Sequence, residues 1–316
     1  ARGEAAFLDH AVLSMVVLLA KSMPEGYAAP CLSRLLAISG NLQHHPFKRL
    51  IGVLQMVADV MSENAFQRFG RAPVTAQKMR LMHAGIRKFV RTQWNEFPDY
   101  HARFGEPVNH EDMLGTLMGL SLLVITGLQQ LHVGLSDEEA EDYYYVWRVY
   151  GQLLGIHPPG DRHATTWIPA SLAEAREFYA SYERRHYVEA SQNPKGVELA
   201  NDNLAMLEYF VPSGLRRLGF QGAANFYMTE LIGREGCARV GIKPTGDYTI
   251  TRGFLQAAVY FQAGLENFID SIGLDSVHHS LSRLLLYGLV TVTYDGTVTF
   301  AIPQSITEIQ GLVKEH

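Results

Sequence analysis

The stretch QKMRLMHAGIRKFV, residues 77–90, places a histidine within the apolar face of a helical pattern. At about 100° per residue, one face of this helix carries Met79, Met82, Ile86, Phe89 and Val90. His83 lies within that face, and Arg80 and Arg87 flank its edge. Lys88 points away from it. A histidine in this setting is either a core residue hydrogen-bonded to a carbonyl or a ligand, and the first is more common.

The composition predicts a soluble globular chain. It has 316 residues, 47% hydrophobic and 19% charged, which suffices for one large core or a core plus a small second domain. A formal net charge of -5 argues against a nucleic-acid binder, which needs a basic face. The apolar run within residues 11–23 is shorter than the ~20 residues of a membrane span, so no transmembrane segment is expected. Cellular compartment and oligomeric state are not predicted.

Helical periodicity dominates the chain. Helices are expected at about 6–22, 47–62, 75–92, 109–132, 137–155, 171–190, 198–218, 224–240, 251–271 and 276–287. Ser136 and Glu139 form a capping-box pattern at one of these starts. Residues 290–302 alternate around Asp295-Gly296, which predicts a β-hairpin. Because a hairpin needs support, we expect an all-helical domain over residues 1–244 and a small α+β appendage of helix plus hairpin over 245–316.

The helix expected at 47–62 is apolar on both sides. One face carries Phe47, Leu50, Ile51, Leu54, Ala58 and Met61, and the opposite face carries Val53, Met56 and Val60 together with Arg49. A helix apolar all round is buried on both sides. It is therefore either a central core helix with a snorkelling arginine or a helix with one side on a large apolar ligand. Haem fits the second reading, since it is flat and apolar, takes an axial imidazole and carries propionates that favour arginine.

Three segments resemble a known family: RLMHAGIR (80–87), GEPVNHEDMLGTLMGLSLLVITGL (105–128) and LSDEEAEDYYYVWRVYGQLLGI (135–156). They are similar to the latex-clearing rubber oxygenases and to related fungal and bacterial oxygenase-like proteins, over roughly residues 25–240. The resemblance implies a globin-like helical core that holds haem b, with dioxygen cleaving double bonds of polyisoprene. It also implies that His83 is the proximal iron ligand and that Arg49 is a candidate catalytic group beside the haem.

The sequence departs from this family on the distal side of the haem. A gapless placement puts Gly52 and Val53 where rubber-cleaving members have a lysine and a threonine, and Ser33 where they have a glutamate proposed as a base. The resemblance thus implies a smaller and less polar distal side, with no base at these positions to remove an allylic proton. Arg49, Arg80, Arg87, Gly52, Val53 and Met56, together with His83, are the expected cofactor-binding residues.

Other site patterns give weaker hypotheses. Glu183 and His186 form one Glu-x-x-His, whereas di-iron bundles need two copies and further glutamates, so a solvated face is favoured. Cys31 and Cys237 are too far apart for a zinc pair and predict buried thiols. An aromatic cluster at Tyr143, Tyr144, Tyr145 and Trp147 predicts core packing. Nucleotide-binding, serine-hydrolase and zinc-protease motifs are absent from the sequence.

Two functions of different classes follow. The first is a haem b-dependent oxygenase that acts with dioxygen on an apolar, unsaturated small molecule, with His83 on the iron and the arginines on the propionates. The second is a haem-bearing or haem-free protein that binds a lipid or a partner without turnover, which the absence of the distal lysine and base favours. A peroxidase-like use of haem lies between these two hypotheses.

Overall fold

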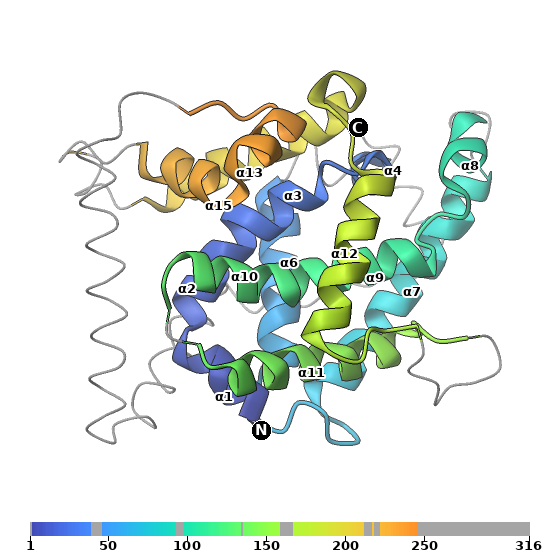
Figure 1. Cartoon of the computed structure of the whole chain (residues 1–316). Coiled ribbons are helices and arrows are strands. Elements are labelled where there is room, and N and C mark those ends of the chain that lie inside the picture. Colours follow the sequence, from blue (N-terminus) through green and yellow to red (C-terminus); the bar gives the residue numbers. More distant parts are fainter. Residues whose placement is uncertain are drawn as a thin grey trace.

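The computed structural model describes residues 2–38, 46–92, 98–133, 135–158, 167–211, 217 and 222–244, and every regular element in these ranges is helical (Figure 1). This agrees with the expected all-helical domain. The α+β appendage, including the hairpin at 290–302, lies outside the described residues. Side chains of residues 46–51 lie outside them as well, although their backbone belongs to a helix.

The elements follow one another in a simple order. The amino-terminal part contains α1 (Arg2–Asp9), α2 (Ala11–Val17), the π-helix η1 (Leu18–Ser22), α3 (Met23–Gly26), α4 (Pro30–Ile38), α6 (Pro46–Val60), α7 (Arg71–Thr92) and α8 (Pro98–Phe104). The second part contains α9 (His110–Leu120), α10 (Leu122–Gln130), α11 (Asp137–Leu154), α12 (Leu172–His186), the 3-10 turn η2 (Ala190–Gln192), α13 (Pro194–Phe210) and α15 (Ala223–Val240).

Two short helices, α4 and α8, were not predicted. The continuous helix expected at 109–132 is also interrupted at Ser121, whose ψ of -78° departs from a regular helix and whose Oγ donates to Leu117 O at 2.6 Å. Hydrophobic periodicity does not predict helices this short, nor a local break in a helix whose apolar pattern continues. The single helix expected at 6–22 is divided among α1, α2 and η1, and the helix expected at 198–218 corresponds to α13, which already ends at Phe210. The other helices expected before residue 244 have counterparts whose ends differ by a few residues, as is usual for helix boundaries.

Local capping chemistry fixes several helix ends. Ser136 and Glu139 form the predicted capping box at the start of α11. Asn109 caps α9 by accepting from Asp112 N, and Ser171 caps α12 by accepting from Glu174 N. At its other end α11 stops at Gly155, where φ is +94°, a conformation that glycine adopts without strain.

Aromatic side chains of α11 fill the centre of the core. Tyr143, Tyr144 and Trp147 are buried, as predicted, but Tyr145 is exposed because it turns to the opposite face of the helix. Tyr143 Oη donates to Leu120 O at 2.9 Å. Figure 1 shows α12 crossing α9 and α11, with α13 and α15 side by side at one end of the molecule.

The π-helix between α2 and α3 lies directly before a proline at the start of α3. Pro24 has no N–H with which to continue the α-helical ladder, and Met23 N bonds to Leu18 O, five residues back. The carbonyl of Leu19, which Met23 would otherwise engage, accepts from the Asn203 side chain of α13. An internal backbone irregularity is thus satisfied by a fully buried amide from another helix.

A second irregularity interrupts α15 at Gly233, where φ is +67° and ψ is -178°. This position needs glycine because an L side chain rarely adopts such a backbone. The interruption brings Cys237 Sγ to 3.9 Å from Thr229 O, across the bend. Cys237 and Cys31 are both buried free thiols, as predicted.

Among the described residues, one segment, His110–Gln130, is long and apolar enough to cross a membrane. Within its most apolar window, 72% of the segment is buried by the rest of the fold. Such burial is typical of a core helix.

Candidate functional site

His83 lies at the middle of α7 with an unpaired buried nitrogen. Its side chain is partly buried, and Nδ1 is shielded from solvent with no hydrogen-bond partner in the described part of the chain. Burial, and then the charge of Arg87, lower the pKa of His83 to about 4. At neutral pH the imidazole is therefore uncharged, the form in which histidine binds metals. The more common arrangement, in which a core histidine hydrogen-bonds to a carbonyl, is not found at Nδ1 in the described part of the chain.

A hydrogen bond between α6 and α7 fixes which residues of the two helices lie at the same level. Thr75 Oγ1 donates to Asp59 Oδ2 at 2.8 Å and joins the two helices where the chain turns between them. The two helices run in opposite directions, so residues equally far from this hydrogen bond lie at the same level. Gly52 is seven residues before Asp59, and Met82 is seven residues after Thr75. Gly52 therefore lies level with the turn that carries His83. From the junction the two helices diverge (Figure 1).

The apolar residues at this level remain partly exposed within the fold. On α7 these are Met79, Met82, Ile86 and Phe89, and on α6 Gly52 and Val53 have the same intermediate burial. Val53 and Met79 pack against the same main core as Met56, which is only 5% exposed. Ile86 and Phe89 pack against the smaller cluster of Leu35, Val90 and Tyr100. They stay partly exposed despite these contacts, and partly exposed apolar side chains are also found in the lining of apolar ligand sites.

Two arginines flank His83 along α7. Arg80 Nη1 donates to Leu153 O, at the carboxyl end of α11, at 3.4 Å. Arg87 Nη1 donates to Val108 O at 3.2 Å. Arg80 is exposed and Arg87 partly buried, and burial lowers the pKa of the Arg87 guanidinium from its ordinary value. The structure thus brings His83 and both arginines to one side of α7, whereas the side chain of Arg49 lies outside the described residues.

The sequence pattern of a family described as "ER-bound oxygenase mpaB/B'/Rubber oxygenase, catalytic domain" matches residues 8–261. That range contains α7 and the helices α6 and α11, which pack on it. The chain belongs to this oxygenase family. The resemblance that the sequence suggested is thereby confirmed.

The chain is also similar to one named relative and to one solved structure. A rubber oxygenase from Streptomyces sp. (strain K30) is 26% identical over 132 residues, which is 41% of this chain and 31% of that protein. The match thus spans less than a third of the relative's length. The solved structure of latex clearing protein LCP in the closed state has a TM-score of 0.61 with 18% identity, over 99% of this chain and 72% of that chain. At that identity the likeness concerns the fold.

Ser33, which the gapless placement compared with a glutamate of rubber-cleaving oxygenases, has a structural role in this fold. Its side chain is fully buried, and Oγ donates to Asn193 Oδ1 at 2.8 Å. Asn193 in turn caps α13 through Gly196 N and donates from Nδ2 to Tyr27 O at 2.7 Å. Position 33 therefore joins α4 to the start of α13. A serine hydroxyl held in this way is not a base.

Sequence reasoning missed a buried carboxyl beside α4. Asp112 is 2% exposed, accepts from Asn109 Nδ2 at 2.8 Å and hydrogen-bonds to the thiol of Cys31. Burial is the main cause that raises the pKa of Asp112 to about 6, against the lowering effect of these contacts and of His186. The Asn-x-x-Asp pattern at the start of α9 was the available signal, but it indicates a helix cap without showing that the carboxyl is enclosed.

The Asp112 carboxyl predicts a pH-dependent stability. A raised pKa means that the folded protein holds the proton more tightly than the unfolded chain, so the free energy of unfolding falls as pH rises from about 4 to about 6. The shift from 3.8 to about 6 corresponds to roughly 3 kcal/mol. Urea unfolding of Asp112→Asn is expected to lack this decline. The neighbouring variant Glu111→Gln removes a lesser cause of the shift and should keep most of the decline. An unchanged pH profile in Asp112→Asn would contradict the assignment.

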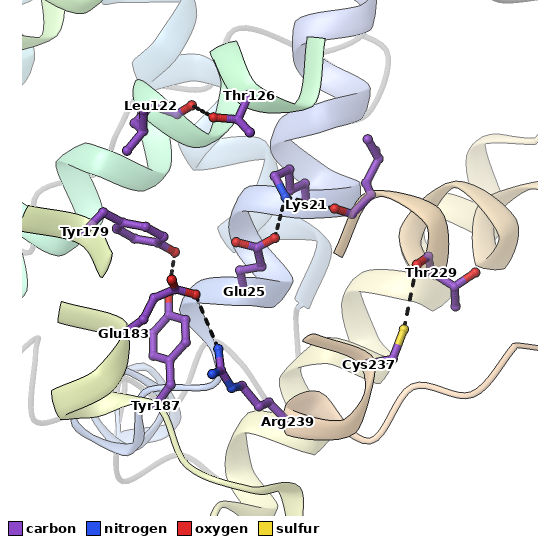
Figure 2. Close-up of polar contacts among 11 residues, drawn as sticks. Lys21, Glu25, Leu122, Thr126, Tyr179, Glu183, Tyr187, Thr229, Cys237 and Arg239 are labelled. Atoms are coloured by element: carbon purple, nitrogen blue, oxygen red, sulfur yellow. Dashed lines mark hydrogen bonds and ion pairs between the residues drawn. The ribbon is translucent and has the colours of Figure 1, made fainter. Parts of the chain in front are cut away.

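A second buried polar cluster joins η1, α3, α12 and α15 (Figure 2). Lys21 Nζ lies 2.6 Å from Glu25 Oε1 and donates to Leu231 O at 2.8 Å, beside the interruption of α15. The hydroxyls of Tyr179 and Tyr187 are 2.6 Å apart. The polar groups of Lys21, Glu25, Tyr179 and Tyr187 are each paired, so we interpret the cluster as one that holds the helices together and not as a ligand site.

The same cluster corrects the expectation of a solvated face at Glu183 and His186. Glu183 is partly buried and lies 3.3 Å from Arg239 Nη1, and His186 Nε2 lies 3.2 Å from Glu111 Oε1. Both side chains contact other helices, whereas Arg184 and Arg185 between them are exposed. In the described part of the chain, no group of three His, Cys, Asp or Glu side chains is arranged to hold a metal ion.

Proposed function

We propose that this chain is a haem b-dependent oxygenase that acts with dioxygen on an apolar, unsaturated substrate of the isoprenoid kind. Its family supports the reaction class, and the rubber oxygenase relative supports the substrate class. The observation that carries the cofactor part is the unpaired Nδ1 of His83, in an imidazole that is neutral at pH 7.

The residues around His83 fit a haem. A buried imidazole nitrogen without a partner is explained when the ring binds a metal. The partly exposed apolar side chains Met79, Met82 and Ile86 suit the flat face of a porphyrin. Arg80 and Arg87 each make one hydrogen bond to a backbone carbonyl, and a guanidinium has further donors for a propionate.

In this proposal each residue has a distinct task. His83 holds the iron through a ring nitrogen, and Arg80 and Arg87 bind the propionates. Gly52 and Val53 keep the approach to the iron small and apolar, which favours dioxygen and a hydrocarbon chain over water. Arg49 is proposed to contribute a third cation from α6. When bound, the haem supplies the activation of dioxygen.

A second candidate function is binding of a lipid without turnover on the same scaffold. The structure of position 33 favours it, because Ser33 donates to Asn193 and supplies no group to remove an allylic proton. Gly52 and Val53 bring no titratable side chain to the distal side either. The two candidates differ in whether dioxygen is consumed.

Oxygen uptake separates these functions. The purified chain loaded with hemin is mixed with squalene, which has isoprenoid double bonds, or with squalane, its saturated counterpart. An oxygenase consumes dioxygen with squalene only, at a rate above that of free hemin, and yields carbonyl products detectable by mass spectrometry. Tight haem binding through His83 with no uptake above free hemin would reject the oxygenase and leave the binding function.

A further inference from the structure

Val108, in the turn before α9, has an unusual backbone. Its φ is +54°, in the left-handed region that β-branched residues rarely occupy. Such a conformation persists where neighbouring interactions impose it, and it is frequently found at functional sites. The side chain of Val108 packs with Leu35, Val90 and Tyr100, so the residue is part of an ordered contact and not a free loop tip.

The interactions that impose this conformation come from α7. Arg87 Nη1 donates to the Val108 carbonyl at 3.2 Å, and Arg91, one turn further along, lies 2.7 Å from Glu106 Oε2. On the other side, Asn109 is held as the cap of α9. The turn is therefore bound to α7 at two points, and the direction of the Val108 carbonyl is set between them.

Arg87 connects this turn to His83. The two side chains are four residues apart and share one face of α7. The guanidinium is close enough for its charge to act on the imidazole, and the other charged groups that act on Arg87 are Arg91 and Glu106. A guanidinium is planar and has several N–H donors. One bond to a fixed carbonyl therefore sets its plane and leaves donors directed elsewhere.

We propose that the backbone carbonyl of Val108 is a positioning group that orients Arg87 to bind a carboxylate of the cofactor. The inference rests on the proposed haem function, and it assigns a role to the turn at 105–109. In this proposal the unfavourable φ of Val108 keeps the Arg87 guanidinium in its binding orientation before the carboxylate binds. Such preorganisation lowers the free-energy cost of binding. Val108 acts through Arg87 and touches neither cofactor nor substrate.

A matched pair of substitutions tests the carbonyl without changing Arg87. Both Val108→Gly and Val108→Pro remove the isopropyl group, but glycine adopts the left-handed conformation and proline cannot. Affinity for hemin is measured by quenching of tryptophan fluorescence. Val108→Gly is expected to bind within about twofold of the original chain. Val108→Pro is expected to bind roughly tenfold more weakly, which corresponds to about 1.4 kcal/mol. Hemin dimethyl ester, which has no carboxylate, should bind equally to both.

Circular dichroism shows whether Val108→Pro folds. If it does not fold, a second pair of variants at Arg87 still tests the proposal. Arg87→Lys keeps the positive charge but lacks the planar guanidinium. It should therefore weaken hemin binding as much as Arg87→Met does. In the Arg87→Met background, Val108→Pro should cause no further loss.

Three results would overturn the inference: equal hemin affinity in the glycine and proline variants, equal losses for hemin and its ester, or normal affinity in Arg87→Lys. If the original chain binds neither hemin nor the ester, the proposed haem function fails as well. Binding that depends on His83 but is insensitive to Val108 rejects only the positioning role.

Discussion

Replacing His83 with leucine is expected to abolish haem binding while leaving the haem-free protein as stable as before or more so. Loss of the iron ligand should weaken hemin binding on the order of a hundredfold or more and remove the Soret band. A buried, unpaired imidazole nitrogen costs about 1–3 kcal/mol, and leucine relieves that cost at Nδ1. A substitution that stabilises the fold and removes the ligand is characteristic of a functional residue.

The control for this experiment is His110→Ala. His110 Nε2 bonds to Gly155 O at 3.1 Å and its ring lies against Trp167, so its removal changes the surface near the carboxyl end of α11 and leaves the His83 imidazole in place. Absorption spectra with added hemin and thermal melting of the haem-free proteins give the two measurements. External imidazole should restore the spectrum of a His83→Gly variant. A normal Soret band in His83→Leu, or a large loss of stability, would show that the ring is an ordinary core residue.

Breaking the buried pair of Lys21 and Glu25 is expected to cost more than any other polar change described here. Their side chains are 7% and 11% exposed, so Lys21→Met leaves a carboxylate enclosed without its partner. Burial already raises the pKa of Glu25 above its ordinary value. Removing one member of such a pair typically costs about 3–5 kcal/mol, whereas replacing both by apolar residues is often neutral.

Urea unfolding of Lys21→Met, Glu25→Leu and the double variant tests this expectation. The double variant should recover most of the stability lost in Lys21→Met, reduced by the hydrogen bond to Leu231 O. Lys195→Met is the surface control, because Lys195 and Glu198 are 2.7 Å apart but 41% and 44% exposed. Its loss should be at most about 1 kcal/mol. Equal losses at Lys21 and Lys195 would mean that the inner pair is solvated.

The sequence predicted most helices because a long apolar stripe is a local property of the chain. The same apolar pattern gave no sign of two departures from regular helix: the π-helix at Leu18–Ser22 and the bend in α15 at Gly233. Lys21 and Glu25 have the spacing of an ordinary surface pair on a helix. Enclosure by other helices, among them α9, α13 and α15, makes the pair a buried one, and Leu231 O, which accepts from Lys21, is 210 positions away.

For the candidate site, the sequence predicted the residues that are close together in the chain and missed the contacts between distant segments. His83, Arg80 and Arg87 are close in sequence, so a single helix brings them together. Ser33 was placed by its match to the family, but its partner Asn193 is 160 residues away and could not be seen in the sequence. Val108 gave no signal, because a backbone angle is set by its surroundings. The ligation of iron by His83 and the role of Arg49 stay predictions.

The widened turn at Leu18–Ser22 affects how this protein should be compared with others. A turn closed by a bond five residues back contains one residue more than an α-helical turn of the same direction. A homologue with a straight helix there would have one residue fewer. Alignments through this region therefore need a single-position gap, without which each later side chain is assigned to a face about 100° away.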